Sequence, residues 1–299
     1  MTLHPPVDPA SFYAELTVRN RGFVPASTQR RLSTATILVA GCGSTGGAVV
    51  DPLVRLGAQH FLLADNGAYE LNNLNRQHAT VSELGRNKAE VSAVHVRAVN
   101  PHAVTTVLPD GITAHNVRPL VRRADVIIDG VDVTEKAGWV AKYLLHEAAA
   151  GVGRPVVSGY DMAGTQYVRF YGYRPGDRPF HGRITRRDLD VVGTWDLLRR
   201  VVPMRVVPVD MLEHARRSLG SRDEAMPQLV YASLLFGAVA SRITLRVLEG
   251  RPVRRHTVVN VDAAVQGPAG NLGATLRKPL VAGLALRDLA VLRRREGTR

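Results

Sequence analysis

Apolar residues in the first half of the chain follow two alternating patterns. Three short runs, 36–40, 60–64 and 125–129, are apolar with little alternation, whereas the apolar residues Val49, Val50, Leu53 and Val54 recur at helical spacing. Unbroken apolar runs are typical of strands buried on both faces of a parallel sheet. Strands that alternate with helices predict an α/β fold with a doubly wound, mainly parallel, Rossmann-like sheet.

The first run leads directly into a glycine-rich turn, which contains Gly41, Gly43, Ser44 and Gly46. A turn between a strand and a helix presents free N–H groups and the positive end of the helix dipole, and both attract phosphate. The second run ends at Asp65, which is placed to hydrogen-bond a ribose hydroxyl. A nucleotide site is therefore predicted, and a purely structural turn is the alternative.

Polar residues beyond Asp65 indicate which nucleotide binds. Asn73, Arg76 and Gln77 follow in one short motif, and Lys88 begins another helical pattern. These cations suit a polyphosphate better than a dinucleotide. Asp132 follows the run 125–129, at the sheet edge where such folds bind ligands, and is a candidate Mg²⁺ ligand. Its alternative role is the N-cap of a helix that begins near Lys136.

Together these residues resemble the MoeB/ThiF/HesA family, the bacterial relatives of ubiquitin-activating enzymes, which bind ATP and adenylate a carboxylate. The resemblance covers most of the chain. Its further matches are Arg19–Gly22, Gln29–Leu32, Asn100–Pro101, Pro155–Gly159, Gly164–Gln166 and a late helix near Gln228–Gly250.

The resemblance implies a role for each matched residue. Asp65 would hold the ribose, Asn73, Arg76 and Lys88 would bind the phosphates, and Asp132 would coordinate Mg²⁺. Arg21, or else Arg19, would reach the phosphates from a second subunit of a homodimer, although an ordinary exposed arm is the alternative. Cations are needed there because negative charge grows on the leaving phosphate oxygens.

Three departures from the family limit the reaction. Cys42 is the only cysteine, so the chain has neither a zinc tetrad nor a free cysteine to accept an acyl group. Gly67 replaces the second acid of an Asp-x-Asp pattern, and the segment Val133–Ala137 lacks the family's Asn and Arg, with Lys136 as a substitute. Chemistry is therefore expected to stop at the acyl-adenylate or to need an outside nucleophile.

The whole chain, 1–299, is predicted to form a single domain. Its parts are a helical N-terminal arm (1–34), a nucleotide-binding core (35–171), a crossover segment (172–227), and a C-terminal helix, strand and tail (228–299). The C-terminal crossover part is expected to add an antiparallel extension to the sheet. The crossover is rich in Arg and Pro, and 206–211 within it is predicted to form a short strand. The resemblance implies that this segment passes over the active site; a solvated loop is the alternative. Candidate residues for an anion-accepting channel are His181, Arg183, Arg186, Arg187 and Trp195, with Asp161 and Gln166 at the pocket edge.

Charge and composition narrow the partners. The net charge of +13 favours polyanions, but no single basic block resembles a nucleic-acid arm, and aromatic residues make up only 5%. ATP or an acidic carrier protein fits this charge, and tRNA is a less favoured partner. The longest apolar run, 229–240, is too short to span a membrane and is predicted to be a packed helix. The lone cysteine suits the cytoplasm.

The leading hypothesis is an ATP- and Mg²⁺-dependent adenylyltransferase. Its substrate would be the C terminus of a small carrier protein or peptide, or a carboxylate on a small molecule or tRNA. The alternatives are a catalytically silent ATP-binding scaffold and, more distantly, an NAD-dependent dehydrogenase.

Overall fold

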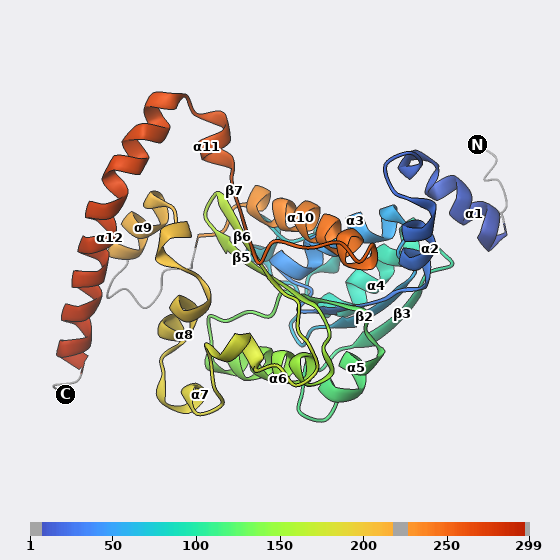
Figure 1. Cartoon of the computed structure of the whole chain (residues 1–299), viewed down its shortest axis with the longest axis horizontal. Helices are drawn as coiled ribbons and strands as arrows, with labels where there is room; N and C mark the ends of the chain where they lie inside the picture. The colour runs from blue at the N-terminus through green and yellow to red at the C-terminus, as the bar shows by residue number, and fades with distance from the viewer. Residues whose placement is uncertain (1–7, 218–226, 297–299) are drawn as a thin grey trace.

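Five parallel strands form the centre of the sheet in a computed structural model that describes residues 8–217 and 227–296 (Figure 1). In spatial order they are β3 (Val104–Leu108), β2 (His60–Ala64), β1 (Thr36–Ala40), β4 (Val126–Asp129) and β5 (Val156–Met162). Because β1 lies between β2 and β4, the order of connection reverses beside it, and this is where open α/β sheets bind ligands.

Two antiparallel strands extend the sheet beyond β5. β6 (Thr165–Tyr171) pairs with β5 through a tight hairpin, and β7 (His256–Asn260) pairs with β6 and ends the sheet. The predicted doubly wound, mainly parallel sheet with an antiparallel extension is thereby confirmed.

Helices cover both faces of the sheet (Figure 1). One face packs against α3 (Ser44–Leu56), α4 (Lys88–Val99) and α10 (Val230–Leu248), and the other against α5 (Val117–Arg123) and α6 (Lys136–Val152). The strands are almost fully buried, as expected for a sheet covered on both sides.

The late apolar run belongs to α10. This helix is long and apolar enough to cross a membrane, but 50% of that stretch is buried inside the protein, where it packs against α3 and β6. Gly237 allows the close approach, because a side chain there would lie 2.4 Å from the carbonyl oxygen of Ala48. The predicted packed helix is therefore what the structure shows.

The N-terminal arm is helical, with α1 (Pro9–Leu16), the 3₁₀-helix η1 (Val18–Asn20) and α2 (Ala26–Thr34). Two more 3₁₀-helices, η2 (Leu71–Asn73) and η3 (Val81–Glu83), lie between β2 and α4.

The crossover segment contains short helices and no strand among its described residues. They are η4 (Pro179–Gly182), α7 (Asp188–Val191), α8 (Thr194–Val201), η5 (Met204–Val206) and α9 (Val209–Arg217). The strand predicted at 206–211 is wrong, because the Pro208 carbonyl accepts the Leu212 N–H and a helix begins there instead. Residues 218–226 of the predicted crossover lie outside the described residues.

The predicted C-terminal tail is largely helical. After β7 come α11 (Val261–Val265) and the 29-residue helix α12 (Pro268–Glu296). α12 lies apart from the sheet and packs beside α9 (Figure 1). Arg216 of α9 forms an ion pair with Asp288 of α12 at 2.9 Å.

Candidate functional site

The glycine turn connects β1 to α3 and is closely packed. Gly41 has a φ of +83°, and a side chain at Gly46 would lie 1.8 Å from the Gly41 carbonyl oxygen. A side chain at Gly130, just after β4, would lie 2.5 Å from the Gly46 backbone nitrogen. Glycine is therefore required at three positions where two strand ends meet the first turn of α3.

Asp65 lies beside this turn at the end of β2. Its carboxylate accepts the backbone N–H groups of Cys42 at 2.6 Å and Gly67 at 2.7 Å. Burial raises the pKa of Asp65, while these two hydrogen bonds and the charge of Lys88 oppose the rise. The Asp65 carboxylate is thus fixed against the turn, in the position predicted for a ribose-binding acid.

The motif from Asn73 to Gln77 folds back toward the same place. The Asn73 side chain is buried and accepts the Glu70 N–H at 3.2 Å, which holds the η2 turn. The Gln77 amide lies 3.6 Å from where a side chain on Gly43 would begin, and its buried oxygen has no hydrogen-bond partner. An unpaired buried polar atom is costly, so this oxygen is a feature that a ligand would satisfy.

Arg76, in the same motif, reaches the segment just before α10. Its Nε donates to the Gln228 side chain at 2.5 Å, just before α10, and its NH1 donates to the Asn72 carbonyl at 2.8 Å. Arg76 forms no ion pair with another described residue, so its charge is available to an anion.

Lys88 and Asp132 lie near the same turn. We call the glycine turn, Asp65, Arg76, Lys88 and Asp132 together the cradle. Lys88 is the first residue of α4, and its Nζ lies 3.6 Å from where a side chain on Gly67 would begin. Its charge acts on Asp65, and so does that of Asp132. Gly67, which replaces the family's second acid, therefore leaves room for the lysine.

Asp132 is exposed in the loop after β4. Its Oδ1 accepts the Thr134 N–H at 2.9 Å, whereas α6 begins at Lys136 with Glu135 as its N-cap residue. The alternative that Asp132 caps this helix is therefore wrong. Lys136, the suggested substitute for a family arginine, is exposed.

Asp161, near the end of β5, is a stronger site residue than the sequence indicated. Its Oδ2 accepts the hydroxyls of Ser44 at 3.0 Å and Ser233 at 3.2 Å, which places a carboxylate at the start of α3. Its Oδ1 is buried without a partner, and burial raises the pKa of Asp161. Ser233 was not anticipated, since it lies within the apolar pattern of α10. Gln166, in register with Asp161, also has a buried side-chain oxygen without a partner.

A second charged group, centred on Asp129, also lies at the end of β4. Lys142 of α6 donates to Asp129 Oδ2 at 2.6 Å, Ser158 of β5 at 2.6 Å and His146 of α6 at 3.0 Å. All four side chains are at most 1% exposed. The lysine charge keeps the pKa of Asp129 below its ordinary value, although burial acts in the opposite direction.

His146 connects the Asp129 group to the crossover. Its Nδ1 lies 2.8 Å from the Tyr173 hydroxyl, which accepts the Phe180 N–H at 2.8 Å. The hydroxyl therefore donates to Nδ1, and Nε2 carries the proton that faces Asp129. Phe180 stacks on the imidazole with ring centroids 4.0 Å apart, although its φ of +53° is rare for a residue with a side chain.

The arm residues Arg19 and Arg21 do not join this cradle within one chain. Both are exposed, and Asn20 between them donates to the Leu56 carbonyl at the far end of α3. A 13-residue helix is about 20 Å long, so the arm lies about that far from the glycine turn. The action of Arg21 from a second subunit stays a prediction.

Cys42 is buried inside the glycine turn. Burial and the nearby Asp65 carboxylate raise the pKa of its thiol. A thiol that resists ionisation is a poor nucleophile, so Cys42 is a packing residue. Within residues 8–217 and 227–296, no three His, Cys, Asp or Glu side chains are grouped to hold a metal by themselves.

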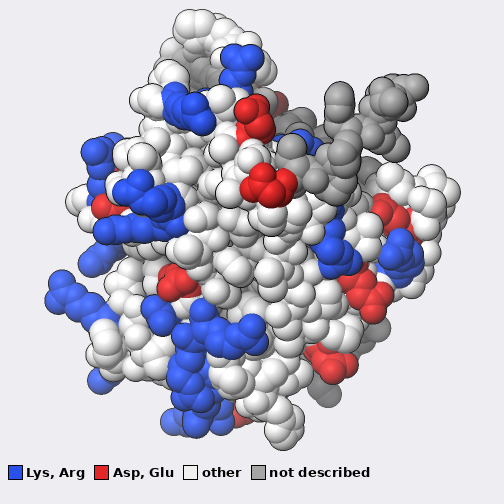
Figure 2. All heavy atoms as spheres, turned by 90° about the vertical axis from the view of Figure 1, so that its right-hand side faces the viewer, with Lys and Arg blue, Asp and Glu red and all other residues white. Residues whose placement is uncertain are grey.

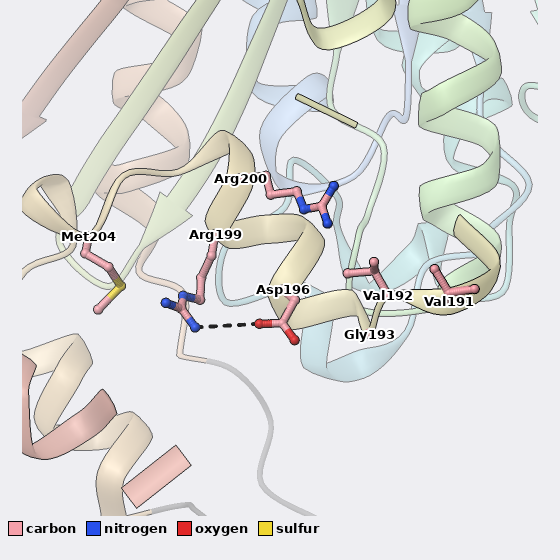
Figure 3. Close-up of a pocket in the computed structure, with 7 residues that line it drawn as sticks. All are labelled: Val191, Val192, Gly193, Asp196, Arg199, Arg200 and Met204. Carbon is pink, nitrogen blue, oxygen red and sulfur yellow. Dashed lines mark ion pairs between the residues drawn. The ribbon is translucent and has the colours of Figure 1, made fainter. Parts of the chain in front are cut away.

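The residues predicted for a crossover channel separate into two groups. Arg186 lies 3.4 Å from Glu147, Arg187 is exposed, and Trp195 is 52% exposed. A hollow of about 520 Å³ lies at α7 and α8, and Val191, Val192, Gly193, Asp196, Arg199, Arg200 and Met204 line it (Figure 3). None of the five predicted channel residues is among these lining residues. The arginines at this hollow are paired, Arg199 with Asp196 at 3.6 Å and Arg200 with Asp188 at 2.8 Å. His181 and Arg183 lie instead with basic residues near β6 and β7.

A family model described as the ThiF family matches residues 17–202, which is more than half of the chain and includes the glycine turn, Asp65, Arg76, Lys88 and Asp132. The chain belongs to the ThiF family. The family predicted from the glycine turn, Asp65 and the motif around Arg76 is thereby confirmed.

The matches to curated relatives cover only part of each relative. An uncharacterised protein of Mycobacterium tuberculosis is 29% identical over 83% of this chain and 35% of its own length. A sulfur carrier protein adenylyltransferase of Thermus thermophilus is 30% identical over 44% of this chain and 47% of its own length. The matched region spans about a third to a half of the length of these relatives.

Solved structures show the same fold. E. coli tRNA N6-threonylcarbamoyladenosine dehydratase, TcdA, superposes with a TM-score of 0.58 at 21% identity, over 82% of this chain and 98% of that one. E. coli MccB, in a complex with AMPCPP and MccA, superposes with a TM-score of 0.58 at 16% identity, over 80% of this chain and 64% of that one. At these identities the likeness supports the ThiF fold alone.

Proposed function

We propose that this protein is an ATP-dependent adenylyltransferase that activates a carboxylate as its acyl-adenylate. The observation that carries the proposal is the arrangement of charged residues around one glycine turn. Asp65 is fixed against the turn, Lys88 and the exposed Asp132 act on Asp65, and Arg76 acts on Asp161, which accepts the Ser44 hydroxyl at the start of α3. Neither cation forms an ion pair with a described residue. Family membership and the adenylyltransferase names of several relatives support it.

The residues present also fit magnesium and a triphosphate. Asp132 Oδ2 accepts no hydrogen bond from the described residues, and Mg²⁺ in nucleotide sites is usually held by one or two carboxylates with phosphate oxygens. Asp132 would hold the ion, with Asp65 nearby at the ribose. When bound, the ion would neutralise negative charge on the phosphate oxygens.

In the reaction, a carboxylate oxygen forms a bond to the α-phosphorus and the bond from that phosphorus to the bridging oxygen breaks. Pyrophosphate then leaves with the electron pair. Arg76 and Lys88 meet the charge that grows on these oxygens, and the first N–H groups of α3 face the phosphates. Because Cys42 is buried and is the only cysteine, the acyl group stays on AMP until an outside nucleophile takes it.

The substrate we propose is the C-terminal carboxylate of a small carrier protein or peptide. The sulfur carrier protein adenylyltransferase and the MccB complex with MccA support this class, as does the strongly basic surface. We further propose a cytoplasmic homodimer, in which Arg21 of one subunit completes the cradle of the other.

Exchange of labelled pyrophosphate into ATP tests the proposal. The purified chain, Mg²⁺, ATP and peptides with a free C-terminal carboxylate are expected to give exchange, and the same peptides amidated at the C terminus are expected to give none. Asp132→Ala is expected to abolish exchange, and Arg118→Ala, an exposed arginine on α5, to leave it unchanged. Tight Mg-ATP binding without exchange for any carboxylate would instead indicate a silent scaffold.

A further inference from the structure

Arg169 and His256 lie side by side on the antiparallel extension of the sheet. They are paired in register on β6 and β7, and Ser158 of β5 continues the same row. Paired residues point to the same face of a sheet, and Ser158 contacts His146 of α6. The row therefore faces the side on which α6 and the crossover pack, away from α3 and α10.

Three separate segments that each carry an arginine pack against this row. The rings of His181 in η4 and Tyr171 lie 5.6 Å apart, and the Arg169 guanidinium lies 4.8 Å from the Tyr171 ring. Arg169 also donates to the Val201 carbonyl, just before η5, at 2.9 Å, and the Arg255 carbonyl accepts the Phe170 N–H at 3.0 Å. Arg183 follows η4, Arg205 is in η5, and Arg255 immediately precedes β7. These three and Arg169 all act on His256: after burial, their charges lower its pKa. His181 is affected in the same way by Arg255, Arg169 and Arg183.

The cluster lacks matching negative charge. Within the described parts of the chain, Arg183, Arg205 and Arg255 form no ion pair, and Arg169 donates to the Val201 carbonyl at 2.9 Å. The acid that acts on His181 is Asp177, whose Oδ2 already accepts the Arg174 N–H at 2.9 Å. Lys278 of α12 adds another cation, because its Nζ donates to the Arg205 carbonyl at 2.5 Å.

This lack of compensation distinguishes the cluster from the hollow beside α8. There the arginines are paired with Asp196 and Asp188, as Figure 3 shows for Arg199 and Asp196. Like charges held together repel, so the fold bears an electrostatic cost that a bound anion would remove.

We infer that Arg183, Arg205, Arg255 and His256 form a docking site for an acidic segment of the peptide or carrier protein whose terminal carboxylate is activated. The inference rests on the proposed function for the identity of that carboxylate. The new element is a second site, which binds carboxylate side chains at a distance from the nucleotide.

A peptide fits this site better than a single-stranded nucleic acid. The rings beside the cations, Tyr167 and Tyr171, are fully buried, so no exposed aromatic platform is present there for stacking bases. β7 is the last strand of the sheet, and an extended peptide can add to such an edge through its backbone. Guanidinium groups also bind carboxylates with two parallel hydrogen bonds.

The register gives the spacing expected in the substrate. Thr165 and Asn260 pair at the end of the strands nearest the cradle, and Arg169 and His256 pair four residues further along. Four residues of extended chain span about 13 Å. The acidic residues of a substrate should therefore lie at least about four residues before its terminal carboxylate.

Fluorescence anisotropy with a labelled probe tests the site directly. The probe is a fluorescein-labelled peptide of four glutamates followed by four glycines with a free C terminus, and serine replaces glutamate in the control peptide. The double variant Arg183→Glu/Arg255→Glu is expected to raise the Kd for the acidic peptide by about tenfold or more. The milder Arg183→Gln/Arg255→Gln should raise it about threefold, which keeps the test valid if the first variant misfolds.

The matched control removes two exposed arginines elsewhere. Arg118→Glu/Arg123→Glu on α5 changes the net charge equally and is expected to alter the Kd by less than twofold. This control is needed because basic side chains also gather on other faces, such as the one seen in Figure 2. Equal weakening by both double variants would overturn the inference. Preferential binding of a labelled U8 RNA that also depends on Arg183 and Arg255 would overturn it too.

Binding and exchange separate this inference from the proposed function. Cluster-dependent peptide binding without pyrophosphate exchange would support the docking site and contradict the adenylyltransferase. If the acidic peptide supports pyrophosphate exchange and its KM is the same in wild-type protein and in Arg183→Glu/Arg255→Glu, the adenylyltransferase is supported and the docking site is contradicted.

Discussion

Two groups of charged residues at the end of β4 differ in how completely they are satisfied. Asp129 accepts hydrogen bonds from Lys142, His146 and Ser158, and all four side chains are buried. Around Asp132, three residues away, Arg76 and Lys88 form no ion pair with a described residue, and Gln77 and Asp161 have buried oxygens without a hydrogen-bond partner. The charges of the Asp129 group, here the paired group, are satisfied by residues of the fold. The charges of the Asp132 group, here the unpaired group, are satisfied only by a ligand. Residue type alone does not distinguish structural from functional charges; their state of pairing does.

The largest effect should come from breaking the paired group. Lys142→Met leaves Asp129 as a buried charge with its main partner removed, and we expect a loss of about 3–5 kcal/mol in the free energy of unfolding. The double variant Asp129→Asn/Lys142→Met should recover part of this loss, because no uncompensated charge remains. Urea denaturation provides the measurement.

Lys88→Met is the matched control in the unpaired group. Lys88 is only partly buried and forms no ion pair with a described residue, so its loss should change the free energy of unfolding by less than about 1 kcal/mol. If Lys88→Met were as destabilising as Lys142→Met, the distinction between the two groups would be lost.

The next effect concerns catalysis. Arg76→Ala should slow pyrophosphate exchange by about 10²-fold or more, because one preorganised charge is lost where negative charge develops. The stability of the fold should hardly change, since the side chain is partly exposed. Arg86→Ala, an exposed arginine nearby, should retain full exchange activity. Comparable losses in both variants would show that general positive charge, and not the position of Arg76, matters.

Much of the fold and of the cradle could be predicted from the sequence because the signals are local. The runs 36–40 and 60–64 match β1 and β2 to the residue. The glycines, Asp65 and the motif around Arg76 occur within 36 residues of chain. Here the spacing alone places a strand end, a tight turn and a polar motif together.

The paired group could not be predicted in this way. Lys142 and His146 are four residues apart on α6, which places them on one helix face, but a lysine in a helix usually faces solvent. Only the position of Asp129 beneath α6 makes burial of that lysine favourable.

The C-terminal half was harder to predict because its contacts are distant in sequence. α12 contains glycines and a proline, and the helix is held partly by ion pairs such as Arg216 with Asp288. The cluster of Arg183, Arg205 and Arg255 comes from three segments that only the crossover brings together. Periodicity carries no information about such pairings.

Acidification should weaken the paired group first. Burial lowers the pKa of His146 below its ordinary value, so the unfolded chain binds a proton that the folded protein excludes, and stability falls as the pH drops below about 6.5. Because the pKa of Asp129 is also lowered, a second loss is expected below about pH 4, where the unfolded aspartate takes up a proton.

The urea midpoint measured from pH 7 to pH 5 reports the histidine effect. It should decline in the wild-type protein and decline less in His146→Gln, which has no ionisable ring. A decline of equal slope in both proteins would assign the acid sensitivity to other residues.

The smallest effect is expected at Asp161, which shares features with both groups. Its carboxylate is buried and accepts two serine hydroxyls, yet it lies at the start of α3, where phosphates are expected. If it stays ionised, it repels the nucleotide by on the order of 1 kcal/mol, which corresponds to about fivefold in Kd. Asp161→Asn should therefore tighten the binding of a fluorescent ATP analogue about fivefold at pH 8.

The pH dependence of this effect provides a check. Because burial raises the pKa of Asp161, the wild-type carboxylate takes up a proton as the pH falls, and the difference in Kd between wild type and Asp161→Asn should shrink. If Asp161→Asn instead binds the analogue more weakly, and only when Mg²⁺ is present, Asp161 is a metal ligand. The unpaired group would then contain two metal ligands, Asp132 and Asp161.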